Sequence, residues 1–303
     1  MRPLATTLGP IVLRSPLIAA SGTVGSVVEF NETVDFSVYG AAVAKSVSPD
    51  EWPGRPSPRL APAGTGMLNA IGIQNPGIGR WEEEIGPRLR GLDVPVWGSA
   101  VGQDPEDFAA VAEGLESTGV ASIEVNLSCP NIEDGSLIAL DADLSARVVE
   151  AVRRVTSLPI GAKLSPNSER ITEVAAAVAG AGADWVVLTN TVWGAGIDIE
   201  TRRPKLSAPI GGYSGPPLKP IALRCVWEVH RELASVPIIG CGGVATGADV
   251  VEFLLAGASA VAIGSTHFAE PRAGRRITRE LKKYMDRHGV DGISDLVGAT
   301  RPW

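Results

Sequence analysis

A repeated two-strand pattern limits the possible folds of this chain more than any other feature of the sequence. One kind of segment places an aliphatic residue and a proline before a short apolar run, and the other places a glycine before an apolar run rich in β-branched residues. The first kind occupies residues 94–97, 158–161 and 236–239, and the second 119–126, 182–189 and 257–264. Alternation of the two kinds along the chain is typical of repeated βα units.

The spacing of these segments supports a true period. The prolines recur at intervals of 64 and 78 residues and the glycines at 63 and 75, so each interval has room for two βα units. The longer second interval contains a glycine- and proline-rich insertion, Gly194–Pro217. Apolar runs at Leu17–Ala20 and Ala41–Ser46 bring the expected strands to eight. Helical stretches are expected at 104–117, 143–155, 169–181, 218–233 and 247–256.

Eight alternating units predict an α/β fold, a closed (β/α)8 or TIM barrel, as one domain over residues 1–303. The alternative is a doubly wound open sheet. Residues 5–13 are expected to form an N-terminal β-hairpin that closes the bottom of the barrel. Insertions are expected after strands 2 and 6, and the first, Ser48–Arg80, is the expected lid or substrate loop.

Composition excludes several classes of partner. The formal net charge is −7, so the chain has no cationic surface of the kind that nucleic acid requires. Nowhere do about eighteen apolar residues run together, so we expect no membrane span and a cytoplasmic protein. The three cysteines form no C-x-x-C pair and the three histidines are scattered, so no metal site is expected.

Polar residues follow six of the eight expected strands. Active sites of (β/α)8 barrels lie at these C-terminal strand ends. The residues are Ser21, Lys45, Ser46, Ser99, Asn126, Ser128, Cys129, Lys163, Thr189, Asn190 and Thr191. A partly buried ammonium group is costly without an anion or an electron-rich ring beside it, so Lys45 and Lys163 are expected to face a ligand. Lysines that extend to the surface are the alternative.

Strands 7 and 8 end instead in glycine turns, Gly240–Gly243 and Gly264–Ser265. Such turns before a helix present backbone N–H groups to a phosphate, so they predict a phosphorylated ligand. Two alternatives stay open: Gly240–Ala245 also fits the G-x-G-x-x-A pattern of dinucleotide folds, and a tight turn needs no ligand.

Cys129 is the candidate reactive group because it lies just past a strand end and precedes a proline. A cysteine on a loop can act as a base or nucleophile if its thiolate is stabilised. The alternative is a small buried apolar residue, which is the interpretation for Cys225 and Cys241.

Five motifs, in order along nearly the whole chain, resemble those of class 1B dihydroorotate dehydrogenases. They are Asn69–Gly77, Asn126–Asn131, Ala162–Asn167, Asn190–Thr191 and Gly211–Pro220. The resemblance implies a flavoprotein that binds flavin mononucleotide (FMN) and oxidises (S)-dihydroorotate to orotate in pyrimidine biosynthesis. It makes Cys129 the general base and Lys163 the stabiliser of the reduced flavin, the two catalytic residues.

The resemblance also assigns the binding residues. FMN would contact Ser21, Lys45, Ser46, Ser99, Asn126, Lys163, Thr189, Gly215, Gly242, Gly243, Gly264 and Ser265. The substrate would contact Lys45, Asn69, Ala70, Ile71, Gly72, Ile73, Asn126, Asn131, Asn190 and Thr191. Amide side chains suit a pyrimidine because each offers a donor and an acceptor.

Class 1B enzymes work with a second subunit that carries FAD and a [2Fe–2S] cluster and passes electrons to NAD⁺, so a homodimer or heterotetramer is expected. Ser99, Thr189, Trp193 and His267 depart from the usual family pattern. Two alternatives follow: an FMN oxidoreductase acting on another dihydropyrimidine, and a non-catalytic barrel subunit.

Overall fold

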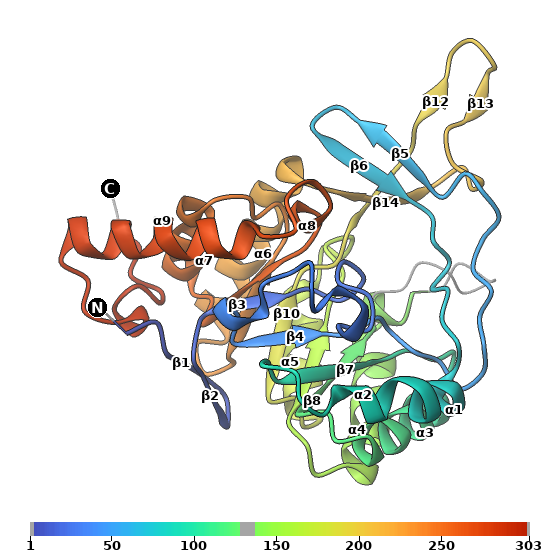
Figure 1. Cartoon of the computed structure of the whole chain (residues 1–303), viewed down its shortest axis with the longest axis horizontal. Coiled ribbons are helices and arrows are strands. Elements are labelled where there is room, and N and C mark those ends of the chain that lie inside the picture. Colours follow the sequence, from blue (N-terminus) through green and yellow to red (C-terminus); the bar gives the residue numbers. More distant parts are fainter. Residues whose placement is uncertain (1–2, 128–136, 302–303) are drawn as a thin grey trace.

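The computed structural model describes residues 3–127 and 137–301. Eight parallel strands form a closed barrel in which each strand pairs with the next in the sequence and the last pairs with the first (Figure 1). The strands are β3 (Leu17–Ala19), β4 (Ala41–Val43), β7 (Val96–Ala100), β8 (Ser122–Asn126), β9 (Ile160–Lys163), β10 (Trp185–Leu188), β15 (Ile238–Cys241) and β16 (Ala260–Ile263). Each strand overlaps a predicted apolar run. The barrel prediction is therefore confirmed, and the open-sheet alternative is wrong.

Helices follow the strands and cover the outside of the barrel. The longer ones are α3 (Pro105–Ser117), α4 (Ala142–Val155), α5 (Ile171–Gly180), α6 (Lys219–Glu232), α7 (Gly247–Ala256) and α9 (Ala273–His288). The short ones are α1 (Ile78–Arg80), the π-helical turn η3 (Trp81–Ile85), α2 (Gly86–Leu89) and α8 (Thr266–Ala269), with 3₁₀ turns at Val28–Phe30, Phe36–Val38, Ile138–Leu140, Pro216–Leu218 and Ile293–Asp295. Within the described residues, no helix is long and apolar enough to cross a membrane.

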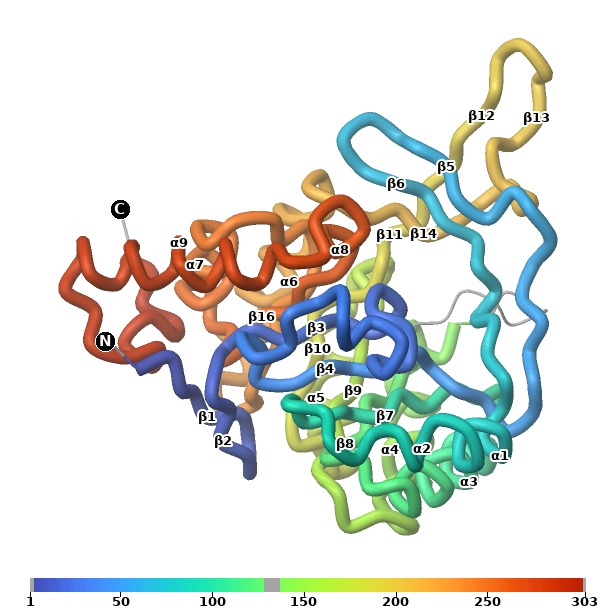
Figure 2. Tube along the Cα trace, in the orientation of Figure 1, coloured from blue at the N-terminus to red at the C-terminus, as the bar shows by residue number. Residues whose placement is uncertain are grey.

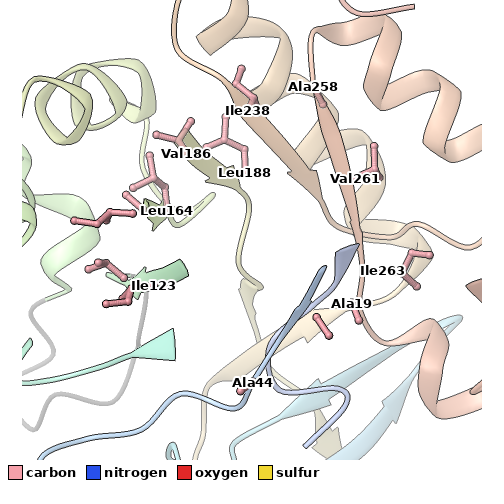
Figure 3. Packing of buried hydrophobic residues seen from close by; sticks show 14 of the residues in the cluster. Ala19, Ala44, Ile123, Leu164, Val186, Leu188, Ile238, Ala258, Val261 and Ile263 are labelled. Carbon is pink, nitrogen blue, oxygen red and sulfur yellow. The ribbon is translucent and has the colours of Figure 1, made fainter. Parts of the chain in front are cut away.

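Side chains alternate between the two faces of each barrel strand. Ile123 and Val125 of β8 belong to the large cluster between barrel and helices, to which Leu164, Val186 and Ile238 of neighbouring segments also contribute (Figure 3). Because neighbouring residues of a strand point to opposite faces, the residues between them face the inside of the barrel.

The lower part of the barrel interior is apolar. Trp97 and Trp185 pack against each other there, with ring centroids 5.1 Å apart. A Cβ atom on Gly161 would lie 2.2 Å from Nε1 of Trp185, so only glycine leaves room for this indole. Leu8 and Leu13 of the N-terminal hairpin, β1 (Thr6–Leu8) and β2 (Ile11–Leu13), join the same apolar cluster. The predicted hairpin therefore does close this end.

The two insertions combine into one small sheet, which we call the cap sheet. It consists of β5 (Leu60–Ala63), β6 (Gly66–Asn69), β11 (Val192–Gly194) and β14 (Gly211–Ser214), in the order β11-β14-β6-β5. Figure 2 shows the blue-cyan and yellow segments side by side, with the hairpin β12 (Ile197–Asp198) and β13 (Arg203–Pro204) projecting beyond them. The sequence predicted both insertions but not their pairing.

Candidate functional site

A cavity of about 740 Å³ lies at the C-terminal ends of the barrel strands and reaches the cap sheet. Its walls contain almost all of the predicted ligand-binding residues. These are Ser21, Lys45, Ser46, Asn69, Ala70, Ile71, Gly72, Ile73, Asn126, Lys163, Thr189, Asn190, Thr191, Gly215, Gly242, Gly243, Gly264 and Ser265. Residues from seven of the eight strand ends and from both insertions therefore surround one space.

Three predicted site residues stand apart from this set. Cys129 and Asn131 lie outside the described residues. Ser99 is fully buried and does not line the cavity. Its direct contact with a flavin stays a prediction, since it lies behind Ser46, a residue of the cavity wall.

A row of hydrogen bonds fixes the polar side chains of one wall. The hydroxyl groups of Ser99 and Ser46 lie 2.9 Å apart, and Nδ2 of Asn126 donates to Oγ of Ser46 over 3.1 Å. Nδ2 of Asn190 then donates to Oδ1 of Asn126 over 3.4 Å, and the backbone N–H of Thr191 donates to Oδ1 of Asn190. The two amide groups are therefore oriented by the protein itself.

Lys163 ends β9 and forms a buried ion pair. Its Nζ lies 3.5 Å from Oε1 of Glu124, and the exposed fractions of the two side chains are 8% and 4%. Burial favours the neutral amine, but the Glu124 carboxylate, with a smaller contribution from Cys241, outweighs burial and raises the pKa of Lys163. The cavity wall therefore carries an ammonium group that can stabilise negative charge beside it.

Cys241 ends β15 and also lines the cavity. Burial raises the pKa of its thiol, and Lys163 opposes that effect only in part. A neutral thiol fits the interpretation of Cys241 as a packing residue.

The glycine turns after β15 and β16 fit a phosphate group. Gly243 has φ +69°, and a Cβ atom there would lie 2.7 Å from the backbone nitrogen of Lys219. A Cβ atom on Gly264 would meet nothing closer than 3.9 Å, so the space beside this residue is open. Among the described residues, no group accepts a hydrogen bond from the backbone N–H of Gly243 or Ser265.

The helix after the first glycine turn, α7, contributes fewer backbone N–H donors to a phosphate site than its position suggested. The side chain of Asp249 accepts hydrogen bonds from the backbone N–H groups of Ala245 and Thr246, and Glu280 accepts one from Gly247. The N-terminus of α7 is thus satisfied by protein carboxylates, and the donors for a phosphate are those of the turn itself.

His267 packs behind the glycine turn that follows β16. Its Nε2 lies 2.8 Å from the hydroxyl of Tyr39, and its Nδ1 lies 3.2 Å from the hydroxyl of Thr23, which donates to the carbonyl of Ala20. The Thr23 oxygen therefore accepts a proton from Nδ1, and Tyr39 donates to Nε2. Burial lowers the pKa of His267 to about 4, so the ring is neutral.

Several lining residues could not be identified from any pattern in the sequence. Arg55 and Met67 come from the first insertion, Ile210 from the second, and Phe268 from α8. The residues of the two insertions reach the cavity because the insertions pair in the cap sheet, and Phe268 follows the glycine turn after β16. Within the described ranges, no three His, Cys, Asp or Glu residues are grouped to hold a metal ion.

Comparison with known proteins identifies the family. Residues 3–285 match the family described as dihydroorotate dehydrogenase. A relative from Geobacter sp. (strain M21) is 42% identical, with 98% of this chain and 97% of the relative aligned, and one from Pelobacter propionicus is 43% identical over 99% of each. Both are named dihydroorotate dehydrogenase B (NAD(+)), catalytic subunit.

A relative from Solibacter usitatus is 43% identical over 98% of each chain, and its name includes dihydroorotate dehydrogenase A and fumarate. The structure of DHODH from Eimeria tenella in complex with ferulenol superposes with a TM-score of 0.82 at 20% identity, over 98% of this chain and 88% of that one. The superposition shows a shared fold. With the family match and relatives that align almost end to end, it follows that this chain belongs to the dihydroorotate dehydrogenase family.

Proposed function

We propose that this chain binds FMN across the barrel mouth and uses it to oxidise (S)-dihydroorotate to orotate in pyrimidine biosynthesis. One observation carries the proposal: a single cavity is lined by Lys45 and Lys163, by Asn69, Asn126 and Asn190, and by both glycine turns. Its volume of about 740 Å³ lies in the range of small-molecule and cofactor sites.

FMN would be held by its phosphate and by its ring. The turns Gly242–Gly243 and Gly264–Ser265 offer backbone N–H groups and close approach to a phosphate. The ring would rest against Ser21, Lys45, Ser46, Asn126, Lys163, Thr189 and Gly215, with Ser99 behind Ser46. When bound, FMN supplies a hydride acceptor, which the amino-acid side chains cannot provide.

The substrate would lie between this ring and the cavity wall that contains Asn126 and Asn190, which we call the asparagine wall. Lys45 offers a positive charge for its carboxylate, and Asn69–Ile73, Asn126, Asn131, Asn190 and Thr191 offer donors and acceptors for the pyrimidine edge. Because Asn126 and Asn190 are already held by neighbouring side chains, binding requires little further ordering of them.

Cys129 would remove the proton from the ring carbon next to the carbonyl, while the hydride leaves the neighbouring carbon that bears the carboxylate. Cys129 follows the cavity-lining Asn126 by three positions in the sequence, which supports this role. The Lys163 ammonium would stabilise the negative charge that develops at the pyrimidine edge of the flavin.

Electrons would leave through a partner subunit that carries FAD and a [2Fe–2S] cluster, with NAD⁺ as final acceptor. The names of the Geobacter and Pelobacter relatives, which include both NAD(+) and a catalytic subunit, support this part. We expect the assembly to be a homodimer or heterotetramer in the cytoplasm, where unpaired cysteines are usual.

The visible spectrum of the purified protein tests the proposal. We expect a yellow protein that releases FMN on denaturation and bleaches when dihydroorotate is added without oxygen. A yellow protein that dihydroorotate fails to bleach would contradict the substrate, and a colourless protein that takes up no added FMN would support the non-catalytic alternative.

A second candidate is an FMN enzyme for another dihydropyrimidine. The side chain of Trp193, which lines the cavity and is 41% exposed, favours it because a large ring at the mouth can change the fit of the substrate. Bleaching by dihydrouracil or dihydrothymine at rates above that of dihydroorotate would support this candidate.

A further inference from the structure

Glu124 lies inside the barrel, one layer below the cavity. On β8 it alternates with Ile123 and Val125, which face the helices, and it precedes the cavity-lining Asn126 by two positions. Its register partners are Ser99 on β7 and Gly161 on β9. The side chain is 4% exposed, so its carboxylate is almost completely removed from water.

A buried carboxylate is costly unless a cation compensates it. Lys163 is the one lysine or arginine that is buried among the described residues, and its Nζ lies 3.5 Å from Glu124. The dependence is mutual, because burial alone would favour the neutral amine of Lys163.

We infer that Glu124 is a positioning residue that keeps Lys163 protonated and holds its ammonium group at the cavity wall. The inference rests on the proposed function, in which that ammonium stabilises the reduced flavin. Glu124 would touch neither flavin nor substrate, since it does not line the cavity. It would act only through Lys163.

The other ionisable groups around Lys163 do not replace Glu124. From β15, Cys241 also raises the pKa of Lys163, but less than Glu124 does, and burial keeps the Cys241 thiol neutral at neutral pH. Lys45, two residues beyond the end of β4, lines the same cavity and is itself a cation. Cys129 lies outside the described residues, so this comparison of the groups around Lys163 covers only those that the structure describes.

Glu124→Gln separates this role from a simple charge effect. If Lys163 stays protonated in the variant, loss of a nearby negative charge favours the reduced, anionic flavin and raises the midpoint potential at every pH. If Glu124 maintains the Lys163 proton, its loss leaves burial as the dominant influence in the variant and lowers the pKa of Lys163. The potential then falls below that of the wild type as pH rises.

The experiment is a spectroelectrochemical titration of the FMN-loaded protein from neutral to alkaline pH. We expect the potential of Glu124→Gln to fall more steeply with pH than that of the wild type, and kcat to gain an alkaline limb. Glu113→Gln is the matched control, because Glu113 is exposed on α3, and it should follow the wild type. The double variant Glu124→Gln with Lys163→Arg should lose the alkaline limb, because a guanidinium stays protonated without help.

Parallel pH curves for the wild type and Glu124→Gln would overturn the inference, as would a potential raised at every pH. If Glu124→Gln does not fold, Glu124→Asp is titrated instead, and a smaller shift in the same direction is expected. Failure of the wild type to bind FMN would overturn the proposed function. A wild type that bleaches normally beside a variant with unchanged pH dependence would overturn this inference alone.

Discussion

The lower and upper layers of the barrel interior are built on the same strands but differ in kind. In the lower layer Trp97, Trp185 and the hairpin leucines fill the space with apolar side chains. Two residues further along β9, from Gly161 to Lys163, the interior holds an ion pair. Replacing a buried ion pair by apolar residues is often neutral or stabilising, so stability alone does not explain the upper layer. The lower layer therefore stabilises the fold, and the upper layer carries the groups that we propose for catalysis.

The largest expected effect falls on activity alone. Cys129→Ala should lower kcat for dihydroorotate by about 10²–10⁴-fold, the usual contribution of a general base, because no thiolate remains to take the proton. Bound FMN and the unfolding midpoint should stay near the wild-type values. Steady-state rates measure kcat, and flavin spectra of the same samples measure bound FMN. A loss of kcat of less than about tenfold would be too small for a general base and would contradict the proposed role of Cys129.

The reverse pattern is expected in the lower layer. Trp185→Ala should cost about 3–5 kcal/mol of unfolding free energy, because it leaves a cavity beside Trp97 that the barrel wall cannot close. Urea unfolding measures the loss, with Trp193→Ala as the control, since that indole is 41% exposed and should cost far less. Equal losses in the two variants would break the distinction between a packed lower layer and an open mouth.

Titration of His267, which lies behind the glycine turns, should make the free energy of unfolding depend on pH. Its pKa falls from the ordinary 6.5 to about 4 in the folded protein, so its contribution is fully present above 6.5 and is lost as pH falls through 4. The difference corresponds to about 3 kcal/mol. Thermal unfolding of the wild type and His267→Asn measures it, and the variant should lose less stability than the wild type on acidification. Identical acid profiles would show that the ring does not titrate in this way.

The smallest expected effect concerns the support of the asparagine wall. Ser99→Ala removes the partner of the Ser46 hydroxyl and should cost about 1 kcal/mol, through one neutral hydrogen bond. We expect FMN affinity to fall less than about tenfold, as flavin fluorescence on dilution would show. A much larger loss would mean that Ser99 itself contacts the flavin.

The barrel was predictable because its signal is local. Each strand is a short apolar run after a proline or glycine, and α7 ends at Ala256 as its sequence pattern indicated. Polar residues at strand ends could be assigned to the cavity for the same reason, since closing the barrel brings all eight ends together. The lower interior could not be read in this way, because Gly161 is explained only by the indole of Trp185 that fills its space.

The cap sheet was not predictable from local pattern. Its central pairing joins Asn69 to Gly212, and glycine is needed there because a Cβ atom on Gly212 would lie 2.3 Å from the hydroxyl oxygen of Thr191. Partners so far apart in the chain leave no periodic signal in either segment. Arg55 and Ile210 reach the cavity through the same arrangement and were missed with it.

A crystal structure of the protein with FMN and orotate would show whether both ligands share this cavity. We expect the phosphate on the turns Gly242–Gly243 and Gly264–Ser265, and orotate between the ring and Asn126 with the Cys129 thiol on its open side. Flavin bound elsewhere, or orotate outside the reach of Asn126 and Asn190, would contradict this arrangement.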